Sequence, residues 1–70
     1  MMPLTYANIG EENIIKRIGG ANETKHHLKH LGFVPGSKIS IVNRINKNVI
    51  VNIKDTRIAI SEELAQKIMI

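Results

Sequence analysis

The chain has 70 residues and no cysteine, which leaves room for one small domain over residues 1–70 and excludes disulfides and thiolate metal sites. Its 10 Lys and Arg residues against 6 Asp and Glu residues give a net charge of +4, and they are spread along the chain with no basic run longer than Lys16-Arg17, as is typical of a solvated surface. No apolar run is long enough for a transmembrane helix or a signal peptide, so we expect a cytoplasmic protein.

A strand and a short helix are the first elements that the sequence predicts. Residues 13–18 (NIIKRI) read as a strand that ends at a Gly-Gly pair. Asn22 is a candidate N-cap for a helix over residues 23–31, because its side chain can accept from the free N–H groups of the first turn. Gly32 follows where helices commonly end, and Pro35-Gly36 predicts a type II turn.

Three strands follow, joined by two tight turns. Residues 38–45 (KISIVNRI) alternate with period two until Ile41-Val42, where the break predicts a bulge. Residues 46–48 form a turn, and the next strand buries one face. Asp55-Thr56 predicts a second turn into a strand over residues 57–60. The side chains expected to face inward are Val49, Val51, Ile53, Ile58 and Ile60.

The C-terminal segment predicts a second helix and a strand stub. Ser61 can cap this helix, with two glutamates in its first turn. Leu64 and Ile68 would form its buried stripe, and Glu63 and Lys67 an exposed i,i+4 pair. Residues 69–70 would add a last strand. Several short strands with two helices predict a mainly β, small α+β domain whose bent sheet closes into a barrel.

The sequence contains no arrangement of residues that would support enzyme catalysis. The acids stand at turns or helix starts, and adjacent carboxylates diverge, so no acid/base pair is evident. The glycines match neither common phosphate-binding loop. We therefore expect no enzymatic activity.

Three histidines in the first helix are the sharpest candidates for metal chemistry. His26 and His30 share the outward face at the i,i+4 spacing that can chelate a divalent metal, whereas His27 lies at the boundary of that face. Two ligands without a third make a weak site. We therefore expect no resident cofactor and at most a weak divalent metal contact at His26 and His30.

Residues 31–37 read LGFVPGS, which is very similar to the LGF-x-PG-[ST] signature of FeoA-type domains. In that family the signature follows a short helix and leads into a strand. Leu4-Thr5, Gly10-Glu11 and the closing residues Ala65 and Ile68 resemble further parts of the family, so the resemblance covers nearly the whole chain. The chain departs from the family at residues 46–48, where the family often has a longer loop.

The resemblance implies an SH3-like five-stranded barrel with one helix inserted after the first strand and a short C-terminal helix. It also implies a cytosolic accessory protein of bacterial ferrous iron uptake that binds or regulates the FeoB GTPase-permease and meets the membrane only through this partner. Within the signature, four residues are expected to be structural: Leu31 as a core residue, and Gly32, Pro35 and Gly36 through turn geometry. The predicted partner contacts are Phe33, Val34 and Lys29, because a loop aromatic beside a turn is a typical anchor.

Two other functions remain open at this point. A stand-alone metal-binding or metal-sensing module would depend on His26 and His30. A nucleic-acid-binding barrel is favoured by the net charge of +4, but Tyr6 and Phe33 are the only aromatics, so bases have few stacking partners and we expect no nucleic-acid partner. Exposed strand edges in so small a domain also make weak self-association plausible.

Overall fold

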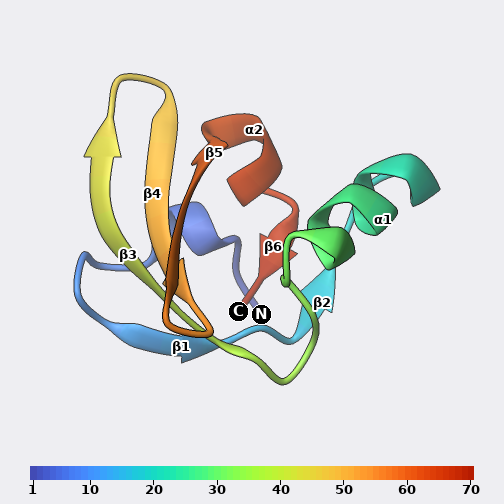
Figure 1. Ribbon diagram of the computed structural model, residues 1–70, viewed down its shortest axis with the longest axis horizontal. Coiled ribbons are helices and arrows are strands. Elements are labelled where there is room, and N and C mark those ends of the chain that lie inside the picture. The colour runs from blue at the N-terminus through green and yellow to red at the C-terminus, as the bar shows by residue number, and fades with distance from the viewer.

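Six short strands and two helices, with a 3-10 helix near the N-terminus, build the fold (Figure 1). The structure is a computed structural model that describes residues 1–70. In chain order the elements are η1 (Leu4–Tyr6), β1 (Glu12–Ile14), β2 (Arg17–Ile18), α1 (Asn22–His30), β3 (Lys38–Ile45), β4 (Asn48–Ile53), β5 (Thr56–Ser61), α2 (Glu62–Ala65) and β6 (Ile68–Met69). The predicted mainly β class with two helices is confirmed.

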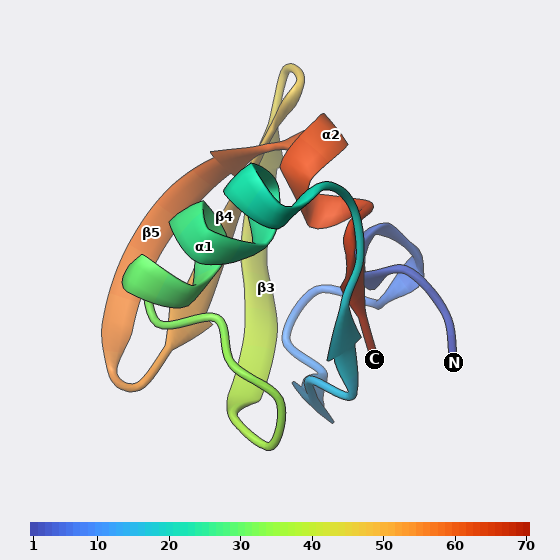
Figure 2. The same cartoon turned by 90° about the vertical axis from the view of Figure 1, so that its right-hand side faces the viewer.

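The strands form two antiparallel sheets that enclose one core. The larger sheet has the order β1-β3-β4-β5, and the smaller one pairs β2 with β6. The β3, β4 and β5 strands curve strongly, and α1 stands outside the sheets on the side of β2 (Figures 1 and 2). The chain ends lie together, since Met2 and Ile70 exchange two backbone hydrogen bonds of 3.0 and 2.8 Å.

The prediction of one strand over residues 13–18 is wrong, because the chain changes partner within it. β1 pairs with β3, whereas β2 pairs with β6. Between them the N–H of Ile15 donates to the Ser37 carbonyl at 2.9 Å, and the N–H of Lys16 donates to the Met69 carbonyl at 2.8 Å. This crossing from one sheet to the other accounts for six strands where the resemblance implied five.

The predicted bulge in β3 is confirmed, and it positions Arg44. The register between β3 and β4 shifts between Ile41 and Asn43. Beyond the shift, the Arg44 guanidinium donates to the backbone carbonyls of Thr5 and Ala7 at 2.9 and 2.7 Å. Arg44 therefore fastens the N-terminal 3-10 segment to the sheet.

We predict that Arg44→Met lowers the free energy of unfolding by about 1–2 kcal/mol, because two backbone carbonyls lose a charged donor. Arg57→Met is the matched control, since Arg57 is an exposed residue of β5, and its loss should change stability by less than about 0.5 kcal/mol. Urea unfolding of both variants measures the difference. Equal losses in the two variants would show that the bonds to Thr5 and Ala7 contribute nothing.

The turn between β4 and β5 consists of Lys54 and Asp55, not of Asp55 and Thr56 as predicted. Ile53 pairs with Thr56, so two residues remain for the turn. Both have positive φ, 50° for Lys54 and 62° for Asp55, as a tight type I′ hairpin requires. The sequence gives no clear signal for this turn, because residues with positive φ in such turns are usually glycine or asparagine rather than lysine.

The core consists of hydrophobic side chains alone, and no polar or charged residue is buried. The predicted inward positions of β4 are confirmed, because Val49, Val51 and Ile53 are at most 2% exposed. In β5, Ile60 is buried and Ile58 packs against the core while half-buried. The buried residues are Leu4, Ala7, Ile15, Leu28, Phe33, Ile39, Ile41, Val49, Val51, Ile53, Ile60, Ala65, Ile68 and Ile70.

The C-terminal helix is shorter than its sequence suggested. The predicted Ser61 cap is confirmed, because its hydroxyl accepts from the N–H of Leu64 at 3.2 Å. α2 ends at Ala65, so Ile68 is buried from strand β6 and the prediction of a helical Leu64–Ile68 stripe is wrong. Lys67 likewise lies beyond the helix, and no ion pair joins it to Glu63. Neither helix has the length and hydrophobicity that crossing a bilayer requires.

Candidate functional site

α1 ends in a Schellman motif built on Gly32. The N–H of Gly32 donates to the Lys29 carbonyl at 3.0 Å, and the N–H of Phe33 donates to the Leu28 carbonyl at 2.9 Å. Gly32 has a φ of 101°, which L side chains rarely adopt. Leu28 and Phe33 are both completely buried in the core, which supplies the apolar contact that usually accompanies this cap. The first half of the LGFVPGS segment is therefore a helix terminus.

The second half of the segment is the predicted type II turn, which is confirmed. The N–H of Ser37 donates to the Val34 carbonyl at 3.1 Å, and Gly36 has a φ of 92°. The N–H of Gly36 also donates to the Ile15 carbonyl at 2.7 Å, while the Ser37 carbonyl accepts from Ile15. Residues 31–37, called the corner below, thus join α1 to the crossing between β1 and β2.

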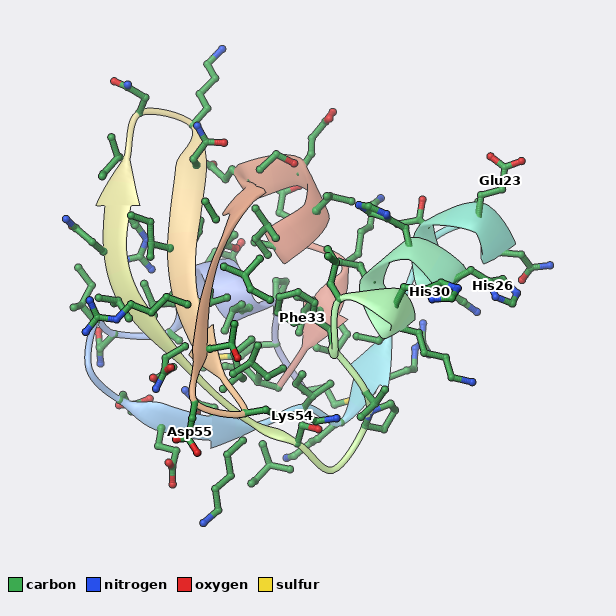
Figure 3. The ribbon with its side chains drawn as sticks, in the orientation of Figure 1. Glu23, His26, His30, Phe33, Lys54 and Asp55 are labelled. Atoms are coloured by element: carbon green, nitrogen blue, oxygen red, sulfur yellow. The ribbon has the colours of Figure 1, made fainter.

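The prediction that Phe33 contacts a partner is wrong, because its side chain has no exposed surface. The Schellman motif turns the position after Gly32 back toward Leu28, and this geometry carries the aromatic ring into the core (Figure 3). A loop aromatic beside a turn looked like an anchor in the sequence. Here the turn itself is what buries the ring.

The accessible part of the corner is small. Val34 and Leu31 are half-buried, and Pro35 is exposed, as is Lys29 in the last turn of α1. The sequence-predicted contacts Val34 and Lys29 are thus within reach of a partner. Gly32, Pro35 and Gly36 hold the positions in the cap and the turn that the sequence predicted for them. Leu31, predicted as the last helix residue and part of the core, is instead the C-cap of α1 and is half-buried.

The start of α1 differs by one residue from its prediction. The helix begins at Asn22, and Ala21 occupies the N-cap position without a side-chain hydrogen bond, so the prediction of Asn22 as N-cap is wrong. Glu23 lies in the first turn, where the helix dipole favours an acid, and Lys29 and His30 lie in the last. The acid in the first turn and the basic residues in the last turn are therefore confirmed.

The three histidines of α1 are all exposed. The rings of His26 and His30 lie on the same outer side of the helix, and the Glu23 carboxylate points away from them (Figure 3). No group of three or more His, Asp or Glu residues is placed to hold a metal ion. His26 and His30 therefore offer two ligands, and a weak divalent metal contact there stays a prediction.

α1 carries exposed lysines, and one further lysine from the C-terminal segment lies near its first turn. Leu28 is the only residue of α1 that is buried, so the helix presents most of its surface to solvent. The side chain of Lys67 reaches its first turn, since a Cβ on Gly20 would lie 3.5 Å from the Lys67 Cδ and 3.6 Å from the Thr24 Cγ2. Lys25 and Lys29 of α1 are both exposed, and so is Lys67.

One surface hollow, of about 200 Å³, lies on α1 and is lined by Asn22, Lys25, His26 and Lys29. Two other shallow grooves lie elsewhere on the molecule. A groove of about 440 Å³ is lined by residues of α2 together with Lys47. Another of about 300 Å³ lies between β1 and the β4–β5 turn, beside the exposed Glu12–Lys38 ion pair of 3.9 Å. Such an exposed pair contributes little to stability. Neither groove contains a cluster of candidate metal ligands.

A family model described as the FeoA domain matches residues 2–70. Among curated proteins, the chain is 39% identical over 70 residues to "Putative Fe(2+) transport protein A" of Methanocaldococcus jannaschii, and the match covers 100% of this chain and 85% of that protein.

Solved structures of the same family share this fold. A crystal structure of an iron uptake regulatory protein (FeoA) superposes with a TM-score of 0.87 at 26% identity, over 96% of this chain and 91% of that one. The zinc complex of Stenotrophomonas maltophilia FeoA, described as a prokaryotic SH3 domain protein, superposes with a TM-score of 0.86 at 21% identity, over 99% of this chain and 88% of that one. The predicted SH3-like fold is confirmed.

Proposed function

This chain belongs to the FeoA domain family of ferrous iron transport, and on that basis we propose that it is a non-enzymatic accessory protein that binds and regulates a FeoB-like GTPase-permease from the cytoplasmic side. The observation that carries the proposal is the family match, which spans residues 2–70. The relative from Methanocaldococcus jannaschii bears the name of an Fe(2+) transport protein. The Stenotrophomonas maltophilia FeoA has been suggested to act as a bacterial ferrous iron transport activating factor.

The architecture supports a binding role. The buried residues are all hydrophobic, and the charged groups lie on the surface, where they are available to a partner. A regulator changes the activity of its partner only if it binds one state of that partner more tightly than another. For a GTPase-permease, those states would differ in the nucleotide-binding part, which is the part we propose as the binding site for this chain.

We predict that the purified chain binds the isolated cytosolic GTPase domain of the FeoB-like permease from the same cell, and that Val34→Ala weakens this binding severalfold. Val34 is the partly accessible aliphatic residue of the corner. Ile45→Ala is the matched control, because Ile45 is an aliphatic residue 48% exposed at the far end of β3. Biolayer interferometry with the immobilised GTPase domain gives the affinities.

Failure of the wild-type chain to bind, together with unchanged ferrous iron uptake in cells that lack it, would refute the proposed function. Equal affinities of the two alanine variants and the wild type would leave the partnership intact but exclude Val34 from the contact. Circular dichroism on each variant separates a lost contact from a lost fold.

A further inference from the structure

We infer that His26 and His30 of α1 form a two-histidine chelate for one divalent transition-metal ion of the Zn²⁺ or Cu²⁺ class, and that the bound ion stabilises the helix. Neither histidine belongs to the corner, which supplies the Val34 contact of the proposed function. The metal site is therefore a further function of the domain, and its test does not depend on the permease.

The geometry of α1 places the two rings on one face. Because α1 is an α-helix over Asn22–His30, residues four apart lie one turn apart, with Cβ atoms about 5–6 Å from each other. Both histidines are exposed, and their rings lie on the same outer side of the helix (Figure 3). No side-chain hydrogen bond or ion pair of the protein involves either ring, so both rings are free to turn toward a shared ion.

His27 is the other candidate for a pair with His30, because it precedes His30 by three residues. At about 100° per residue, His26 and His30 lie about 40° apart around the helix, whereas His27 and His30 lie about 60° apart. The His26–His30 pair is directly opposite Leu28, which is the one buried residue of α1. An ion held by this pair faces solvent, where water molecules can complete its coordination.

The ligand chemistry selects the class of metal. Imidazole suits Zn²⁺, Cu²⁺ and Ni²⁺, and the affinity of such sites is highest for Cu²⁺, whereas Mg²⁺ and Ca²⁺ prefer oxygen ligands. The Glu23 carboxylate points away from both rings, and no group of three His, Asp or Glu residues is placed to hold the ion (Figure 3). We therefore expect a site that binds more weakly than the closed four-ligand sites of structural zinc.

Two lysines beside the pair reduce the affinity for a cation without preventing coordination. Lys25 and Lys29 line the hollow on α1 together with His26. Both ammonium groups are exposed, so water and dissolved ions screen their repulsion over about 8 Å at physiological ionic strength. The imidazole nitrogens, in contrast, bind the ion in direct contact.

A bound ion would stabilise a helix that has little other support. α1 has nine residues, its N-cap Ala21 makes no side-chain hydrogen bond, and it buries only Leu28. Helices of this length are marginal in water unless tertiary contacts hold them. The two rings can share an ion only while the turn between them is helical, so the ion binds the formed helix in preference to the frayed one and shifts the equilibrium toward it.

The test titrates zinc chloride into the tag-free, labelled chain at about pH 7.5, where the metal-binding neutral form of imidazole predominates. We expect the NMR ring signals of His26 and His30 to shift together along one binding curve. Zn²⁺ in about tenfold excess over its Kd should raise the Tm by about 5–10 °C. Mg²⁺ should produce neither response.

His27→Ala is the matched control for His26→Ala and for His30→Ala. All three changes remove an exposed imidazole from the same helix and introduce the strongest helix former, so the fold is retained. Isothermal titration calorimetry with Zn²⁺ measures the affinities. We expect His26→Ala and His30→Ala to weaken binding by about tenfold or more and to lose the rise in Tm, whereas His27→Ala keeps both.

A wild-type chain whose ring signals and Tm do not respond to Zn²⁺ would overturn the inference. Equal losses of affinity in His26→Ala and His27→Ala would also overturn it, because binding would then not belong to the His26–His30 pair. The proposed function is tested separately. If the wild type fails to bind the GTPase domain but binds Zn²⁺ through His26 and His30, the proposed function fails and the inference is supported.

Discussion

Phe33→Ala is expected to leave the domain largely unfolded at room temperature. Truncating a buried phenylalanine to alanine typically lowers the free energy of unfolding by about 3–5 kcal/mol, through lost burial and the cavity left behind. The core of a domain of this size supplies only about 3–5 kcal/mol in total. Phe33 is completely buried at the point where α1 meets the core, so the loss in the variant is comparable to the whole stability of the domain.

Phe33→Leu is the matched control, because it keeps most of the buried apolar volume and should remain folded with a smaller loss of stability. Thermal unfolding followed by circular dichroism distinguishes the two variants. A folded Phe33→Ala protein with near wild-type stability would contradict the assignment of Phe33 to the core. It would also return this residue to the surface role that the sequence suggested.

Local patterns in the sequence predicted much of the fold. The alternation in β3 and β4 identified the buried face, and its interruption at Ile41-Val42 located the bulge. The Pro35-Gly36 turn and the Ser61 cap depend on backbone geometry that their own residue types impose. Such features are decided within a few neighbouring residues, and the sequence therefore contains enough information to predict them.

The errors arose where distant segments decide the outcome. Residues 13–18 look like one strand, but Ser37 and Met69 each bind part of this segment and divide it between two sheets. Phe33 looks like a loop residue, but the cap at Gly32 turns it toward Leu28. In each case the deciding partner is set by the tertiary fold, which local periodicity does not describe.

The distribution of charge shows the same limit for the candidate site. Along the sequence the basic residues are scattered, which favoured a merely solvated surface. The β2–β6 pairing brings the Lys67 side chain next to Gly20 and the first turn of α1. The proximity of Lys67 to α1 exists only because β2 and β6 are paired, which the sequence does not describe.

Gly32→Ala is expected to lower the free energy of unfolding by about 1–2 kcal/mol, although there is room for the added methyl group. A Cβ at this position would meet only the Lys54 Cδ, at 4.0 Å, which is an ordinary contact. The loss comes from the backbone, since an L residue is strained at a φ of 101°. Urea unfolding at constant m-value measures it.

Gly19→Ala is the matched control for this substitution. Gly19 has no positive φ, and its Cβ would lie 3.6 Å from the Lys67 carbonyl oxygen, so the change should leave stability equal or slightly raised. Gly32→Asn tests the cause, because asparagine tolerates left-handed backbone better than alanine does. If the side chain's size were responsible, the larger asparagine would destabilise more than alanine. If the backbone is responsible, asparagine recovers part of the loss, and the glycine of the LGFVPGS segment is required by the helix terminus rather than by a partner.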